Sequence, residues 1–146
     1  MSRTSRNTGL GKRIASLAGA TALLLAGGVA TAGQAAAGAS CPSGYHCVFQ
    51  GSVGGIGHKS FFNSDADFTD DYWEDTGESV NDQVMAASNS SNGGYESHYY
   101  KDINYGGGLL FCVNPGSQVN WDQLDWTQRN KASSLRLRPT TTIPCF

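Results

Sequence analysis

YKDINYGG at residues 100–107, followed downstream by NKASS at 130–134, is the stretch that decides the fold. A weaker copy comes earlier in the chain, where Phe49 leads to GG at 54–55 and then to NDQV at 81–84. Glycines allow the positive backbone angles of a tight folded hairpin, and serine hydroxyls suit a turn in which they bond to nearby backbone groups. The pattern therefore predicts two similar units that share one core, each a four-stranded Greek key.

The rest of the chain is rich in strand signals and poor in helix signals after residue 37. Short apolar runs, separated by Gly, Asn, Asp and Ser, lie at 46–49, 59–62, 84–87, 96–100, 109–113 and 134–138. Such runs are typical of a β-sandwich, so we expect an all-β fold. The polar segment 89–94 is predicted to be a hinge between two halves of similar size.

Residues 1–37 have the pattern of a cleaved secretory signal peptide. Basic residues come first, an apolar run follows at 14–26, and small residues with A-x-A patterns end the segment. This order is typical of an exported chain, and we expect cleavage between about residues 32 and 40. Glycines interrupt the apolar run, which argues against a spanning helix. We therefore expect a secreted protein without a membrane anchor, with one domain at 41–146.

The part of the chain that would remain after cleavage is acidic. The full sequence has ten basic residues (Lys and Arg) and twelve acidic ones (Asp and Glu), and four of the basic residues lie in the leader. Six basic residues then face twelve acidic ones, a net charge of −6 with histidines neutral. Nucleic acids and anionic membrane surfaces attract positive charge, so neither is an expected partner. We expect a monomer with one modest core.

All four cysteines fall within residues 41–146. An even number in an exported protein points to two disulfides, for which three pairings are possible. We favour Cys41 with Cys47, which closes a short loop near the new N-terminus, and Cys112 with Cys145, which ties the C-terminal tail to the body. A metal site is the weaker alternative, because the sequence has no C-x-x-C pattern and its three histidines are scattered.

The spacing of Tyr100, Tyr105 and Gly107, with a downstream serine at Ser133 or Ser134, resembles the motif of the βγ-crystallin superfamily. In that motif the serine pins the folded hairpin, and Ser134 is the residue we assign to this role. The resemblance implies a βγ-crystallin-like sandwich of two Greek-key motifs, at about 45–89 and about 98–139. The earlier copy departs from the motif because its aromatic-to-glycine spacing is one residue short and Val53 replaces the second aromatic, so we expect a distorted first hairpin.

Three segments taken together resemble peptidase inhibitor family I36, a group of secreted bacterial proteins: CPSGYHC at 41–47, NYGG at 104–107 and NKASS at 130–134. The characterised type of that family is a metalloproteinase inhibitor from Streptomyces. The resemblance covers residues 41–146. It implies a secreted proteinaceous inhibitor whose partner is an extracellular, thermolysin-like metalloproteinase.

By this resemblance, LLFCVNP at 109–115 is the candidate inhibitory segment, and the bond between Cys112 and Val113 is the candidate reactive bond. An inhibitor needs an extended segment that enters the proteinase cleft and is held so rigidly that cutting it gains little. A disulfide at Cys112 would tether one side of the cut. Val113 suits thermolysin-like metalloproteinases, which cleave before a bulky apolar residue. The alternative is that this run is a central strand in which Cys112 serves only to form a structural disulfide.

Calcium binding is a second possibility, because many βγ-crystallin motifs resemble N/D-N/D-x-x-S/T-S and supply the oxygen ligands that calcium prefers. The first copy keeps Asn81 and Asp82 but loses both hydroxyls. The second keeps Asn130 and Ser133 but has Arg129 at the first acidic position. Each copy is therefore half a site, and we favour a structural role for these groups in turns. We expect no cofactor, with calcium as the alternative.

Eight acidic residues fall within 65–82 and are interleaved with aromatic residues. A solvated loop is the favoured interpretation of this acidic run. The alternatives are a surface that steers a basic partner, or additional weak calcium binding. We expect Trp73, Trp121 and Trp126 to be core or rim residues and not a sugar-binding platform.

Enzymatic activity is not expected, and no catalytic residues are assigned. The sequence has no HExxH or G-x-S-x-G motif and no convincing Cys/His pair, and cysteines in disulfides are not nucleophiles. A glycosidase-like carboxylate pair stays open, since nothing singles out two of the acidic residues. Two other classes remain as alternatives: a crystallin-like secreted toxin or antimicrobial protein, and a structural calcium-binding βγ-crystallin.

Overall fold

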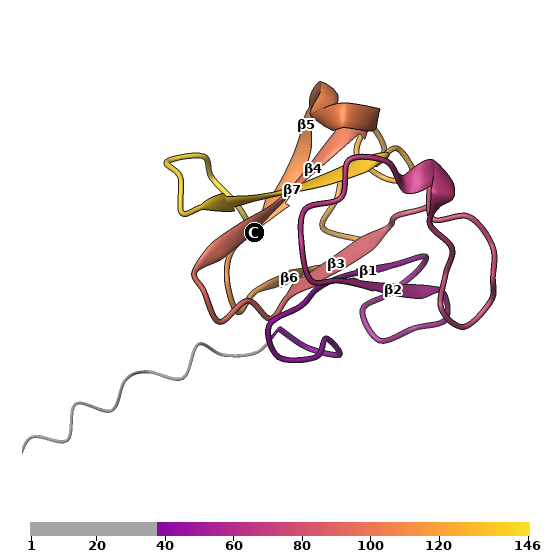
Figure 1. Cartoon of the computed structure of the whole chain (residues 1–146), viewed down its shortest axis with the longest axis horizontal. Coiled ribbons are helices and arrows are strands. Elements are labelled where there is room, and N and C mark those ends of the chain that lie inside the picture. Colours follow the sequence, from indigo (N-terminus) through magenta and orange to yellow (C-terminus); the bar gives the residue numbers. More distant parts are fainter. Residues whose placement is uncertain (1–37) are drawn as a thin grey trace, which may run out of the picture. The chain divides into compact units, whose positions relative to one another are not determined.

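The computed structural model describes residues 38–146, which form two antiparallel β-sheets packed face to face (Figure 1). The four-stranded sheet has the order β2-β1-β3-β6 and comprises β1 (His46–Phe49), β2 (His58–Phe61), β3 (Ala86–Asn89) and β6 (Gln118–Val119). The three-stranded sheet has the order β5-β4-β7 and comprises β4 (Tyr95–Asp102), β5 (Gly106–Val113) and β7 (Ser134–Pro139). The all-β prediction is confirmed.

Two short 3-10 turns complete the secondary structure of these residues, η1 at Phe68–Asp70 and η2 at Ile103–Tyr105. Within the described part of the chain, no helix has the length and apolar character needed to span a membrane. The predicted signal peptide lies outside the described residues.

The predicted strands match the observed ones to within a few residues. The first, 46–49, has the predicted bounds, whereas β3 begins two residues later than predicted and extends to Asn89. The short strand β6 was not expected from the sequence, because two residues carry no detectable alternation. Apolar runs bounded by turn residues therefore locate the longer strands well.

The polar segment 89–94 is not a hinge, which corrects the prediction made from its composition. Its first residues are buried, and Asn89 is part of β3. The Asn89 amide donates hydrogen bonds to the carbonyl oxygens of Tyr95 at 2.8 Å and Val113 at 3.0 Å. The Ser90 hydroxyl lies 2.9 Å from each of two carbonyl oxygens in the segment before β1. Because buried polar groups are stable when partnered, this segment fastens the two sheets together.

The hydrophobic core lies between the sheets and draws on both of them and on the long connection between β2 and β3. Tyr99 on β4 stacks on Phe111 of β5 with ring centroids 4.6 Å apart. Trp73 is buried, whereas Trp121 and Trp126 are exposed. The core comprises Val48, Phe61, Phe68, Trp73, Val80, Val84, Ala87, Tyr99, Phe111, Val113, Val119, Leu124, Ala132 and Leu135.

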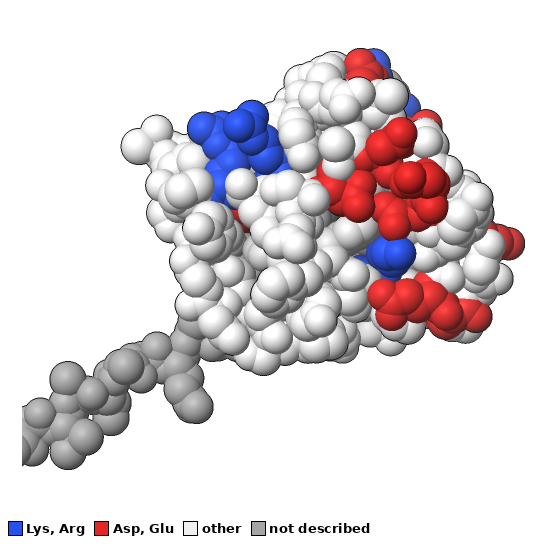
Figure 2. Space-filling model, in the orientation of Figure 1, with Lys and Arg blue, Asp and Glu red and all other residues white. Residues whose placement is uncertain are grey.

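The acidic run 65–82 is more ordered than the solvated loop that its charge predicts. It contributes Phe68 and Trp73 to the core, and its carboxylates accept hydrogen bonds from backbone groups. Asp67 begins η1 by accepting from the backbone and hydroxyl of Thr69, and these bonds lower the pKa of Asp67. In Figure 2 the acidic side chains gather over this part of the molecule, with a basic patch between them, while a second basic cluster lies elsewhere on the same face.

The hairpin between β4 and β5 folds back on itself as the second-copy motif predicts. Tyr105 and Gly107 both have positive φ values, 61° and 67°. The Ser134 hydroxyl accepts a hydrogen bond from the Tyr105 N–H at 3.2 Å and donates one to the Asp102 carbonyl at 2.8 Å. The Tyr100 and Tyr105 rings meet edge to face, 6.1 Å apart. Ser134 is therefore placed to pin this hairpin.

Candidate functional site

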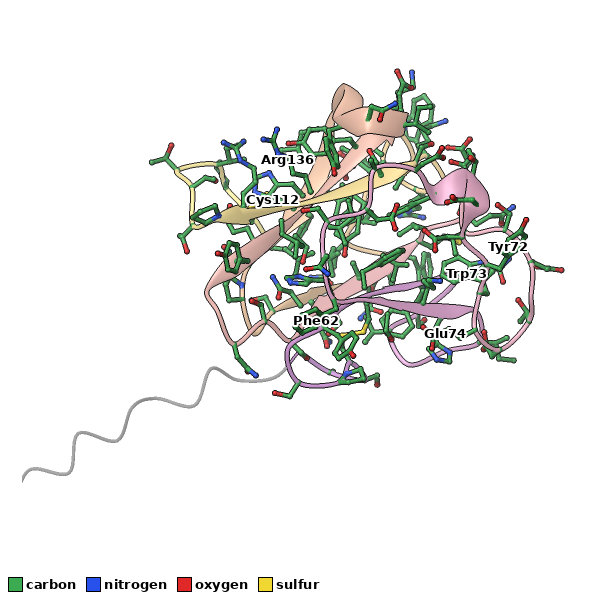
Figure 3. The ribbon with its side chains drawn as sticks, viewed as in Figure 1. Phe62, Tyr72, Trp73, Glu74, Cys112 and Arg136 are labelled. Carbon is green, nitrogen blue, oxygen red and sulfur yellow. A yellow bond between two sulfur atoms is a disulfide. The ribbon has the colours of Figure 1, made fainter. Side chains whose placement is uncertain are left out.

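The candidate reactive bond lies near the end of β5, an edge strand of the three-stranded sheet. Cys112 is 2 % exposed, and Val113 is fully buried in the core. In the β4–β5 register, Cys112 pairs with His98 and Val113 with Ser97. Figure 3 shows Cys112 on this sheet, in the region of Arg136. The geometry is that of a packed strand.

The C-terminal tail covers the outer edge of β5 at this point. The Phe146 N–H donates a hydrogen bond to the Cys112 carbonyl oxygen at 3.0 Å, and the Asn114 N–H donates one to the Phe146 carbonyl oxygen at 2.8 Å. The Val113 carbonyl oxygen already accepts the Asn89 amide. A proteinase needs these backbone groups free, so it can reach the Cys112–Val113 bond only after the tail has moved away.

Both disulfides join the pairs that the sequence favoured, Cys41 with Cys47 and Cys112 with Cys145. The second one fixes the tail to β5, with the two cysteines 33 residues apart in the sequence. The first one closes a loop before β1 and belongs to a small apolar cluster with Phe49. Each disulfide therefore stiffens a different end of the fold.

Under the tail lies a buried carboxylate and imidazole pair that the sequence did not reveal. The Glu96 carboxylate lies 2.7 Å from Nε2 of His98 and accepts hydrogen bonds from the backbone and hydroxyl of Thr141 at 2.9 and 2.8 Å. Burial works to raise the pKa of Glu96, but the bonds from His98 and Thr141 outweigh it and lower that pKa. Along β4, Glu96 stands on the face of the sheet opposite the core, where a glutamate normally meets solvent. Its burial depends on the C-terminal tail, whose position could not be predicted from the sequence.

The sulfur atoms of Cys112 and Cys145 and a ring nitrogen of His98 lie within 4.8 Å of one another. Both sulfurs belong to the disulfide, which removes the thiolates that a metal would need. This cluster therefore acts as a structural clamp between β4, β5 and the tail.

The structure brings the calcium candidates of the two copies to one place. The Asp82 N–H donates to the Ala132 carbonyl oxygen at 3.0 Å, and the Asn130 N–H donates to the Val84 carbonyl oxygen at 2.9 Å. Asp82 and Asn130 also share positive φ values, 56° and 53°. The two segments therefore make reciprocal backbone contacts and share the same backbone conformation at Asp82 and Asn130.

The side chains around this junction are of mixed charge. The Ser133 hydroxyl lies 3.3 Å from a carboxylate oxygen of Asp82, and the Asn81 amide lies 3.2 Å from the other. Lys101 and Lys131 line the same hollow of about 280 Å³. Their ammonium groups oppose a cation, and the hydrogen bonds fit the structural role in turns that we favoured from the sequence.

The other acidic side chains mostly serve as local anchors. Asp71 lies 2.9 Å from the Lys59 ammonium, and burial raises the pKa of Asp71 although Lys59 opposes that rise. Asp75 accepts hydrogen bonds from the backbone of Gly57 at 2.8 Å and His58 at 3.1 Å. These contacts support the hairpin between β1 and β2.

The model of peptidase inhibitor family I36 matches residues 34–113, more than half of the chain. The chain belongs to peptidase inhibitor family I36. The I36 match begins before the Cys41–Cys47 disulfide, includes β1 to β4 and ends at the last residue of β5. Comparison with curated proteins and with solved structures gave no match.

Family I36 is a family of peptidase inhibitors, so the function class is inhibition and the implied partner is a peptidase. Membership also points to a binding protein and not to an enzyme. Strands β6 and β7 and the tail that covers Cys112 lie beyond the I36 match. The further relation to the βγ-crystallin superfamily stays a prediction.

Proposed function

We propose that this protein is secreted and inhibits an extracellular metalloproteinase of the thermolysin type, as a monomer and without a cofactor. Membership in family I36 is the observation that carries the proposal. The leader-like pattern at residues 1–37 and the two disulfides support export, because disulfides persist in oxidising compartments.

The proposed mode of action is occupation of the active-site cleft by a rigid segment of the inhibitor. Such a segment must be exposed, and it must lose little conformational freedom on binding. Two disulfides and many hydrogen bonds from side chains to backbone give this small domain the required stiffness. Cleavage of the segment by the target then gains little, since the cut segment stays in place and is released slowly.

The Cys112–Val113 bond stays a prediction as the reactive bond. If it were cut, the disulfide would hold Cys112 to the tail and the β4 pairing would hold Val113. Its burial means that the tail must first detach. Peptide mapping of the inhibitor after long incubation with the proteinase would show whether a new N-terminus appears at Val113.

Titration of thermolysin with the purified protein tests the proposal. We expect loss of proteolytic activity to be linear in inhibitor and complete near a one-to-one ratio. Trypsin, a serine proteinase, serves as the control for general interference with the substrate. Full activity of thermolysin and of several other secreted zinc proteinases at excess inhibitor would refute the proposed target class.

A further inference from the structure

We propose that the cavity where β1 and β4 begin is a binding site for a neutral saccharide. The cavity has a volume of about 540 Å³, and its walls come from the start of β1, the segment after β2, the turn before β4 and Leu137 of β7. A hollow of this size suits a small ligand. Among the described residues, none of β5 lines it, so the site is separate from the candidate reactive bond and goes beyond the proposed function.

A buried imidazole, that of His46, contributes to the wall of the cavity. His46 is 2 % exposed, and its backbone pairs on both sides, with Phe61 of β2 and Asn89 of β3, so its side chain is the part that reaches the cavity. Nδ1 lies 2.6 Å from the Ser97 hydroxyl, whereas Nε2 has no hydrogen-bond partner among residues 38–146. Burial lowers the pKa of His46 from 6.5 to about 4, so the ring is neutral at pH 7. Nε2 is therefore available to a ligand hydroxyl.

Two aromatic rings stand at the mouth of the cavity. Phe62 is 63 % exposed and Tyr95 is 45 % exposed, and both line it. The Phe62 ring meets the Tyr45 ring edge to face, with centroids 5.4 Å apart. The Tyr95 ring packs on Gly93, where an added Cβ would stand 3.1 Å from two of its atoms. Aromatic faces attract the C–H groups on the apolar side of a sugar ring, and rings that are already supported lose little freedom on binding.

Amide and hydroxyl groups make up most of the remaining polar lining. Asn63 and Asn92 are both exposed at the cavity. The Asn92 amide nitrogen donates a hydrogen bond to the Ser43 hydroxyl at 2.8 Å, which orients this side chain and leaves its oxygen as an acceptor. A side-chain amide both donates and accepts hydrogen bonds, as a sugar hydroxyl does. The polar groups of the cavity therefore match a ligand that carries several hydroxyls.

The absence of charge in the lining decides between ligand classes. Among the described residues that line the cavity, none is Lys, Arg, Asp or Glu. A phosphate or carboxylate ligand would lack a cation to pair with, and a metal ion would lack carboxylate ligands. An acyl chain would leave the imidazole and the amides without partners. A neutral molecule with many hydroxyls and one apolar face satisfies the rings and the polar groups together.

Isothermal titration calorimetry of the purified protein tests the site with two neutral trisaccharides, cellotriose and tri-N-acetylchitotriose. We expect saturable binding of at least one of them, and comparison of the two shows whether an acetamido group is recognised. Phe62→Ala and Tyr95→Ala each remove one ring, and we expect the dissociation constant to rise about tenfold. Tyr72→Ala is the matched control, because Tyr72 is 57 % exposed but lies outside the cavity, and Figure 3 shows it well separated from Phe62. Its dissociation constant should equal that of the wild type.

Nitrogen resonances of the histidine rings give a second readout. Saccharide binding should shift the Nε2 signal of His46 and leave the signals of His58, which lies outside the cavity, unchanged. Absence of binding to both sugars at millimolar concentration would overturn the proposal. Binding that is equal in Tyr95→Ala and Tyr72→Ala, or that leaves the His46 signals unchanged, would place the sugar elsewhere and overturn it too.

Melting temperatures should match the wild type for all three variants, because the exchanged side chains are exposed, and this shows that the fold is intact. The assay contains no proteinase, so its failure and the failure of the proposed function are distinguishable.

Discussion

The β1–β2 and β4–β5 hairpins, one from each predicted copy of the repeat, are held by different groups. Ser134 pins the β4–β5 hairpin through two hydrogen bonds, and the ring of Tyr105 packs on Tyr100 and under the Arg136 guanidinium. The β1–β2 hairpin is tied instead by Asp75 and Asn120. A repeat unit can therefore lose its motif residues and keep its hairpin if other segments supply the missing hydrogen bonds.

Removal of the disulfides, one in each half of the domain, should have the largest effect on stability. Replacing both Cys112 and Cys145 with serine should lower the free energy of unfolding by about 4 kcal/mol, and the same change at Cys41 and Cys47 by about 2 kcal/mol. The reason is the longer loop closed by the second disulfide, with a separation of 33 residues against 6. Urea denaturation midpoints check the ranking. Equal losses would show that strain or packing, and not loop length, sets the contribution of each disulfide.

Acid should weaken the fold through a buried histidine of the first half. His46 on β1 lies 2.6 Å from the Ser97 hydroxyl of β4, and burial lowers the pKa of His46 from 6.5 to about 4. Between these pH values the unfolded chain binds a proton that the folded chain excludes. Stability is therefore retained above pH 6.5 and falls as the pH drops towards 4, by up to about 3 kcal/mol.

Urea denaturation at a series of pH values measures this loss. The variant His46→Asn has no proton to gain in this window, so its stability should change less between pH 6.5 and 4. His58→Asn is the control for the loss of an imidazole as such, because the His58 side chain is 41 % exposed on β2, away from the interior position of His46. A profile that is identical in wild type and His46→Asn would assign the acid sensitivity to other groups.

The serine that pins the second hairpin gives a smaller expected effect. Ser134→Ala leaves the Tyr105 N–H and the Asp102 carbonyl without their partner, and we expect a loss of about 2 kcal/mol in the free energy of unfolding. Ala86 stands at the equivalent place in the first copy, opposite Phe49 as Ser134 is opposite Tyr100.

The reverse exchange, Ala86→Ser, is the matched variant. Ala86 is fully buried in the small apolar cluster, so a hydroxyl there is buried and we expect destabilisation as well. Stabilisation by Ala86→Ser would mean that a serine hydroxyl can hold the β1–β2 hairpin as Ser134 holds the β4–β5 hairpin. The two hairpins would then be more alike than their contacts indicate.

Calcium should have the smallest effect. The junction of the two copies places Lys101 and Lys131 beside Asp82, so we expect no rise in melting temperature when millimolar calcium is added. Differential scanning calorimetry with calcium and with a chelator makes the comparison. A clear rise would revive the structural calcium-binding alternative.

Much of the fold could be predicted from local sequence patterns, whereas the burial or exposure of particular residues could not. The bounds of β1 were readable because an apolar run stands between turn residues, and Tyr105, Gly107 and Ser134 identified the folded hairpin. The burial of Asn89 was not readable, because a run of asparagine and serine normally favours turns. Its amide is satisfied by carbonyl groups from other strands, which only the tertiary structure provides.

The candidate site shows the same limit. Cys112 and Val113 have the residue types of a reactive bond, but nothing near them in the sequence reveals that Phe146 covers that edge.

The pairing of the tail with β5 also protects the protein from association with other chains. An edge strand with free N–H and C=O groups is a template for strand addition, and secreted proteins meet many partners that could use it. Phe146 occupies the edge of β5 near Cys112, and Asp65 forms a bridge with Leu135 on the opposite edge of the same sheet. The disulfide to Cys145 keeps the first of these covers next to β5, so the clamp that hides the candidate bond also disfavours growth of the three-stranded sheet.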